Sequence, residues 1–421
     1  MIPDPNPIMA LPFAALLLCI AVMPMLFPHI WEKHYQKIAV SLGALCVVYY
    51  LAGLHAPGRM LHIAGEYLSF IVFIGSLFTV AGGIHIRVKG ESTPSVNCLF
   101  LVVGALLANL IGTTGASMLL IRPWVRSNKY RYTGFHTAFF IFLVSNVGGC
   151  LTPIGDPPLF LGYLKGVPFW WVSQHCWPAW LTAVAMITGI FYLFDRTNFV
   201  RAPRAIREKE TAHESFKIEG LQSFIALAVI LLSVVYAPPV LREVIMAGAA
   251  FISHKRTLRP IHDANHFSFG PIREVAWLFA GIFMTMVPAL DYLQLHASTL
   301  GLRSPQQFYW LSGALSGVLD NAPTYLAFIS AAFGLRNLDL NNAAHVSQFL
   351  DQHGIYVIAV SLGSVFFGAM TYIGNGPNLM VKAIADHAKV HTPSFFGYVF
   401  RFSLPVLVPV FLVIARFYIA K

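Results

Sequence analysis

Residues 145–162 read SNVGGCLTPIGDPPLFLG, and this stretch decides how the segment around it can fold. The flanking residues are apolar, but the centre of the stretch places three prolines and Gly155 around Asp156. Proline removes a backbone donor and clashes with the preceding helical turn, whereas glycine permits backbone conformations closed to other residues. The segment is therefore predicted to be a helix that is interrupted in its middle.

The composition of the whole chain is that of a membrane protein. Of the 421 residues, 57% are hydrophobic and 11% are charged, whereas soluble proteins carry about 25% charged residues. Apolar runs of about 20 residues recur along the chain, and each is long enough to cross a bilayer as a helix. We predict an all-α polytopic protein of the inner membrane, with about 10–11 transmembrane segments plus two re-entrant hairpins.

The net charge of +10 is concentrated in short loops. The tendency of Lys and Arg to lie on the cytoplasmic side explains this pattern better than a nucleic-acid partner. The loops and spans divide the chain into four predicted parts. These are N-terminal transmembrane helices (1–60), a first repeat (61–195), a linker with two spans and basic cytoplasmic loops (196–272) and a second repeat (273–421).

The apolar segment 99–122 presents a topological problem. The basic residues Arg87 and Arg122 are both predicted to be cytoplasmic, although this single segment separates them. Its middle holds polar and small residues from Asn109 to Thr114, which suit irregular backbone next to a cavity. A re-entrant hairpin resolves the problem, and a plain helix with a packing face of Gly and Thr is the alternative.

The broken segment has a second copy in the chain. GCLTPIGDPP (149–158) aligns with GAMTYIGNGP (368–377), so that Asp156 lies opposite Asn375. The predicted topology inverts the two halves. The first half contains a hairpin at 99–122 and a broken helix at 135–165, and the second contains a hairpin at 307–334 and a broken helix at 354–385. Inverted repeats with interrupted helices are typical of secondary transporters.

Helix breaks leave free carbonyls and free N–H groups, which bind cations and anions respectively. Asp156 adds a charge that costs roughly 2.5–3.5 kcal/mol at membrane depth unless it is paired or functional. An N-cap role for Asp156 is the alternative, with Asn375 as the uncharged cap of the second copy and Asp320 restoring an acid there. The candidate ion- and substrate-binding residues are Asn109, Thr113, Thr114, Asn146, Thr152, Gly155, Asp156, Asp320, Asn321, Thr324, Thr371, Gly374, Asn375 and Asn378.

These candidates offer hard oxygen ligands, which suit Na⁺ or H⁺ as a coupling ion and do not suit zinc or copper. We therefore expect Na⁺ at the hairpin tips and helix breaks and no other cofactor.

Neither a nucleophile motif nor a His/Cys metal pattern is present in the sequence, so we expect no enzymatic activity. Glu66 and Glu274 are interpreted as interfacial anchors, Lys382 as a snorkelling or partnering charge, and the histidines of 254–266 as part of a solvated loop.

The motifs NxGGxxTPIGDPP, LDNAP and TxIGNGPN together resemble the ion transporter superfamily. The similar branch holds NhaD-type sodium/proton antiporters, arsenite permeases and citrate transporters, and the resemblance covers residues 60–419. It implies a homodimer in which each protomer has a scaffold part and a transport part that slides like an elevator. It also implies that the hairpin tips and helix breaks frame the substrate and cation sites.

The leading hypothesis is a cation-coupled secondary transporter, a Na⁺/H⁺ antiporter in which Asp156 and Asp320 are the coupling acids. The alternative is a Na⁺- or H⁺-coupled symporter of citrate or a related organic anion, and a passive ion channel ranks third. The Ser-Asn-Thr tips of the dicarboxylate branch are absent, and neither predicted tip carries an Arg that would hold a carboxylate.

Overall fold

The computed structural model describes residues 3–87, 92–203, 217–265 and 267–420. Within these residues, nine helices are long and apolar enough to cross a membrane, and α9 (Leu221–Tyr236) is a shorter apolar helix. The prediction of a helical, multi-pass membrane protein is thus confirmed, with a short two-stranded sheet besides the helices, whereas the predicted count of about 10–11 spans exceeds the nine found in the described residues. The predicted spans at 240–253 and 307–334 are not among the nine, because the first becomes α10 (Leu241–Arg256) with charged ends and the second is divided into two short helices.

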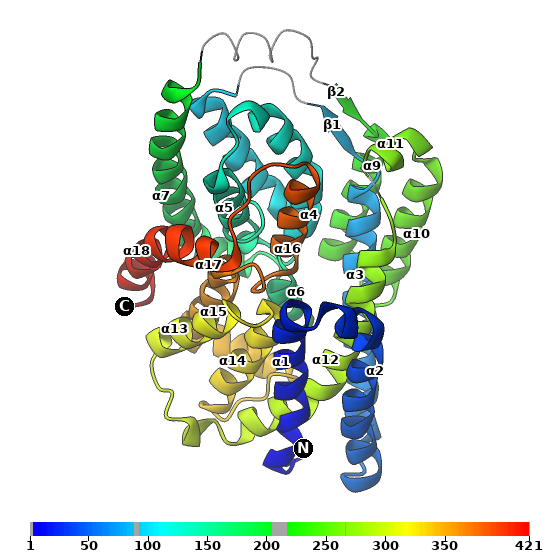
Figure 1. The fold of residues 1–421 in the computed structure, drawn as a ribbon. Helices are drawn as coiled ribbons and strands as arrows, with labels where there is room; N and C mark the ends of the chain where they lie inside the picture. Colours follow the sequence, from blue (N-terminus) through cyan, green and yellow to red (C-terminus); the bar gives the residue numbers. More distant parts are fainter. Residues whose placement is uncertain (1–2, 88–91, 204–216, 266, 421) are drawn as a thin grey trace.

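The helices form two groups (Figure 1). The first group consists of α1 (Leu11–Leu26), α2 (Pro28–Val48), α3 (Pro57–Ala81), α9, α10 and α12 (Gly270–Leu295). The second consists of α4 (Pro94–Asn128), α5 (Gly134–Leu143), α6 (Pro157–Leu164), α7 (Trp171–Arg201), α13 (Pro305–Ser316), α14 (Asn321–Gly334), α15 (Ala343–Phe367), α16 (Gly376–His387) and α18 (Leu404–Ile414). The groups meet where α3 contacts α4 and α6 and where α12 contacts α14.

The described residues that flank several of the predicted basic loops lie at one end of the molecule, the upper end in Figure 1. Strand β1 (His85–Arg87) pairs antiparallel with β2 (Lys217–Glu219). At the same end, the His85 ring lies 2.9 Å from the Asn265 amide oxygen, and Asn198 donates to the carbonyl of Arg131 over 2.9 Å. Residues 88–91, 204–216 and His266, which belong to these predicted loops, lie outside the described residues. The cytoplasmic location of this end stays a prediction.

Helix α4 turns back on itself at Gly112, whose φ of 75° and ψ of 154° are not helical. The amide of Asn97 donates to the side-chain oxygen of Asn128 over 2.8 Å. In a straight helix these two residues would lie about 45 Å apart, at 1.5 Å per residue. The plain-helix interpretation of this segment is therefore wrong. The folded-back segment extends beyond the predicted 99–122 because buried polar contacts stabilise its ends.

The segment 305–334 folds back in a similar way. Helices α13 and α14 are separated by Gly317–Asp320, and the rings of Phe308 in α13 and Phe328 in α14 lie 6.1 Å apart in an edge-on arrangement. Because α13 and α14 are both short, hydropathy alone predicted one long span over this segment.

Both predicted broken helices are interrupted. In the first, a 3₁₀ turn (Val147–Leu151) and an irregular stretch separate α5 from α6, and in the second a 3₁₀ turn (Gly368–Met370) stands between α15 and α16. At each break, two glycine backbones come into contact. A Cβ on Gly155 would lie 2.0 Å from the oxygen of Gly149, and one on Gly374 would lie 2.7 Å from the oxygen of Gly368. Side chains do not fit there, so these glycines are required by close approach.

Candidate functional site

The carboxylate of Asp156 lies where the four interrupted segments converge, and the residue is 1% exposed. Its Oδ1 accepts hydrogen bonds from the Thr113 hydroxyl, at 2.7 Å, and from the Asn375 amide, at 3.1 Å. Its Oδ2 accepts one from the Asn321 amide at 2.6 Å. Thr113 follows the turn of α4, Asn321 begins α14 and Asn375 precedes α16. Residues more than 160 positions apart in the sequence thus meet at one acid.

The N-cap interpretation of Asp156 is wrong. Asp156 precedes α6, but among the described residues no backbone N–H donates to its carboxylate. The physical reason is that α6 begins with Pro157 and Pro158, which have no N–H to offer. Asn375 likewise makes no side-chain cap to α16. The capping acid is instead Asp320, which accepts from the N–H of Ala322 at 3.0 Å.

A chain of amides connects the two breaks behind Asp156. The Asn375 amide lies 3.1 Å from the carbonyl oxygen of Ser145 and 3.2 Å from the side-chain oxygen of Asn146. Asn146 in turn donates to the side-chain oxygen of Asn378 at 2.8 Å, and Asn378 donates to the carbonyl of Gly368. This network holds the two breaks against each other and orients the Asn375 amide toward Asp156.

Other predicted site residues attach each turn to its break. Thr152 donates to the carbonyl of Asn109 at 2.6 Å, and Thr371 donates to the carbonyl of Gly317 at 2.7 Å. The Asn109 amide bonds to the carbonyl of Gly148 at 2.6 Å. These side chains shape the site, because their bonds go to backbone groups of the neighbouring segment instead of to Asp156.

The remaining candidates take up separate positions around the acid. Thr324 donates to the carbonyl of Asp320 at 2.9 Å. The carbonyl of Gly155 accepts from the N–H of Thr113 at 2.8 Å, which seats the turn of α4 on the first break. Asp320 stands directly before Asn321, whose amide donates to Asp156. Gly374 packs against Gly368, as described above, and Thr114 lines the pocket described next.

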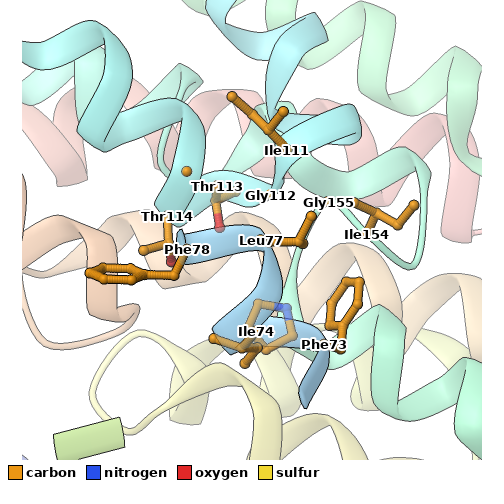
Figure 2. Close-up of a pocket in the computed structure, with 12 residues that line it drawn as sticks. Phe73, Ile74, Leu77, Phe78, Ile111, Gly112, Thr113, Thr114, Ile154 and Gly155 are labelled. Atoms are coloured by element: carbon orange, nitrogen blue, oxygen red, sulfur yellow. The ribbon is translucent and has the colours of Figure 1, made fainter. Parts of the chain in front are cut away.

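A small pocket opens between α3 and the turn of α4 (Figure 2). Phe73, Ile74, Leu77 and Phe78 of α3 line one side, and residues 111–115 with Ile154, Gly155 and Pro157 line the other. Thr113 and Thr114 supply its side-chain hydroxyls. The cavity has a volume of about 40 Å³, which is room for a water or an ion, whereas pockets for organic ligands usually exceed about 300 Å³.

Two buried ionic clusters were not identified from the sequence. In the first, Lys165 donates to Glu66 at 2.7 Å, Arg59 pairs with Asp291 at 2.6 Å, and both cations donate to the side-chain oxygen of Asn341. Glu66 is 8% exposed, so its interpretation as an interfacial anchor is wrong. The available signal was Lys165 itself, a cation directly after an apolar, broken segment.

In the second cluster, Asp195 of α7 binds the guanidinium of Arg131 and lies 3.2 Å from the ring of His136. The Asn97 amide also donates to Asp195 at 2.9 Å. The sequence did contain a signal for this cluster, because Asp195 is an acid at the end of the apolar span predicted at 176–195. By contrast, Lys382 lies at the surface and pairs with Asp386 at 2.6 Å.

The described residues contain no group of three or more His, Cys, Asp or Glu side chains placed to hold a metal ion. Together, the fold and the site define a multi-pass helical membrane protein in which interrupted helices meet at one buried acid.

This chain belongs to the family described as "Putative citrate transport", whose model matches residues 5–419. The family is part of the ion transporter superfamily, so the membership expected from the motifs is confirmed. The chain is also similar to the "46 kDa membrane protein" of Mycobacterium leprae (strain TN). The two are 25% identical over 324 residues, which cover 71% of this chain and 72% of that protein.

Proposed function

We propose that this protein is a cation-coupled secondary transporter of the inner membrane that exchanges Na⁺ for H⁺ at Asp156. The observation that carries the proposal is the hydrogen-bond shell of Asp156, in which Thr113, Asn321 and Asn375 are all neutral donors. A buried carboxylate without a cationic partner retains its charge at a cost. A proton or a Na⁺ ion at this carboxylate removes the cost, and because both use the same group, binding of one displaces the other.

The residues around Asp156 suit a hard cation. Hydroxyl, amide and carboxylate oxygens are ligands that alkali ions accept, and the two interrupted helices contribute further carbonyls at the breaks. Asp320 is proposed as the second coupling acid, because it directly precedes Asn321, whose amide binds the Asp156 carboxylate. A site with two such acids would bind at least one proton or cation.

The transport mechanism is part of the same proposal. We propose that 94–128 and 305–334 are re-entrant hairpins of an inverted repeat, within the predicted division into four parts. The matching bonds from Thr152 to Asn109 and from Thr371 to Gly317 support this repeat. In the proposed homodimer, the group of helices around α3 and α12 acts as the scaffold, and the group holding Asp156 slides against it.

Citrate symport is the second candidate function, and the family match favours it. Two observations count against citrate at Asp156 in this conformation. The neighbouring cavity is about 40 Å³, and among the described residues no basic side chain bonds to the acid. A passive channel ranks third, and saturable flux would exclude it.

The test uses the purified protein in liposomes that contain a pH-sensitive dye. Added Na⁺ or Li⁺ is expected to drive protons across the membrane at a saturable rate, and Asp156→Asn is expected to abolish this movement. The matched control is Asp386→Asn, since Asp386 is a surface acid. If Na⁺ moves no protons while labelled citrate accumulates, the antiport proposal is wrong and citrate symport replaces it.

A further inference from the structure

A second pocket lies far from Asp156, between the start of α5 and the last turns of α7. It is a groove of about 500 Å³ lined by Thr133, Phe135, Leu193, Phe194, Thr197, Asn198 and Arg201. The α7 residues are spaced four apart, at 193, 197 and 201 and at 194 and 198, so they form one face of the helix. The groove therefore follows the axis of α7.

The polarity of the groove changes along that axis. Leu193, which is 64% exposed, and Phe194 form the end nearer the middle of α7. Thr197, Asn198 and Arg201 form the end nearer the basic loops. The eight steps from Leu193 to Arg201 span about 12 Å of helix, at 1.5 Å per residue. An apolar floor that ends in a cation has the polarity of a phospholipid at the membrane surface.

The local charges leave the groove positive. The nearby acid, Asp195, faces the opposite way, where it binds Arg131 and His136 and is fully buried. In the described part of the chain, no acid is paired with Arg201, whose side chain lines the groove. Among the described residues, an anionic group placed beside Arg201 would therefore meet no unpaired acid of α7.

We propose that this groove binds one anionic phospholipid, with its phosphate at Arg201 and an acyl chain along Leu193, Phe194 and Phe135. The lipid would lie against both α5 and α7 and so join the start of the first broken helix to its neighbour. Charge complementarity favours a lipid over a second copy of this chain, because a symmetric contact through this face would bury two cationic grooves in one interface. The inference does not depend on what the protein transports.

Native mass spectrometry of the full-length protein in detergent tests the proposal, with phosphatidylglycerol, phosphatidylcholine and inorganic phosphate as separate probes. Phosphatidylglycerol is expected to be retained at one copy per protomer in preference to phosphatidylcholine. Arg201→Gln should weaken that retention about fivefold, the usual contribution of one basic side chain at an anionic membrane surface. Arg201→Lys should restore most of it.

The matched control is Arg196→Gln, since Arg196 is an exposed cation of the same helix that does not line the groove. Equal weakening by both substitutions would overturn the proposal, because it would indicate attraction by charge in general. Equal retention of both lipids would also overturn it. Inorganic phosphate that binds as tightly as the lipid would do so as well, since the apolar floor would then contribute nothing. A disulfide between two copies of Leu193→Cys, formed in a bilayer of phosphatidylglycerol, would identify the groove as a protein interface instead.

Discussion

At the scale of single residues, the environment of Asp156 determines what this acid can do. Its hydrogen-bond partners are a hydroxyl and two amides, and one of these amides, that of Asn375, is also bonded to the carbonyl of Ser145. Such donors stabilise a carboxylate without neutralising it. Asp156 is therefore expected to respond to cations and protons, whereas Asp195, which is paired with Arg131, is expected to be structural.

Asp156→Asn is the direct test at this scale. The substitution keeps the size of the side chain but removes the charge that would bind Na⁺ or a proton. We expect Na⁺-dependent transport to fall by at least about a hundredfold, as for loss of roughly 3 kcal/mol at a charged, hydrogen-bonded group. Size-exclusion chromatography should still show a folded protein. Transport at the wild-type rate would contradict a coupling role for this acid.

Thr113→Val tests the hydrogen-bond shell separately from the acid. Valine has nearly the shape of threonine but cannot donate to Asp156, so one donor at 2.7 Å is lost. A hydrogen bond to a charged group contributes about 1.5–3 kcal/mol, and we expect the apparent Na⁺ affinity to change by about tenfold or more. Thr299→Val is the matched control, because Thr299 is an exposed threonine outside the site, whose hydroxyl donates to the carbonyl of His296. An equal effect of both substitutions would argue against a specific role for Thr113.

At the scale of elements, the tight backbone contacts at the breaks are the feature most open to test. Gly155→Ala would place a Cβ 2.0 Å from the oxygen of Gly149. Because that neighbour is backbone, it cannot move aside without opening the break. We expect a loss of about 2 kcal/mol or more in stability, measured as a lower melting temperature in detergent. Gly189→Ala in α7, where a Cβ meets nothing within 4 Å, should leave the melting temperature unchanged.

The breaks could be predicted from the sequence because Pro and Gly act locally on the backbone. Asp156 was identifiable for the same reason, as a charge inside an apolar segment. The ends of α4 were not predicted, since hydropathy falls at Arg122 while the helix continues to Asn128. That extension depends on Asn97, 31 residues away. Asp320 caps a helix and Asp156 does not, because only Asp320 is directly followed by residues that have N–H groups. This difference could have been read from the sequence, since Pro157 and Pro158 follow Asp156.

At the scale of the whole molecule, the first ionic cluster joins the two groups of helices. Glu66 and Arg59 belong to α3, and Asp291 belongs to α12, all in the first group. Lys165 and Asn341 follow α6 and α14 of the second group. A sliding movement between the groups would have to break the Lys165–Glu66 pair and the bond from Arg59 to Asn341. The Arg59–Asp291 pair and the bond from Lys165 to Asn341 could persist, because each lies within one group. The Lys165–Glu66 pair is thus expected to favour the conformation seen here.

Comparing Lys165→Met with the double variant Lys165→Met/Glu66→Gln tests this role. Both side chains are buried, at 3% and 9% exposure, so removing Lys165 alone leaves the Glu66 charge poorly compensated, which costs about 3–5 kcal/mol. The double variant removes both charges and should recover most of the melting temperature lost by the single variant. If the pair also holds the two groups together, the double variant should transport faster than the wild type at saturating Na⁺, because less energy is needed to separate them. Recovery of the melting temperature without faster transport would mean that the pair stabilises the fold but does not hold the two groups together. Additive losses of stability from the two substitutions would contradict an interaction between Lys165 and Glu66.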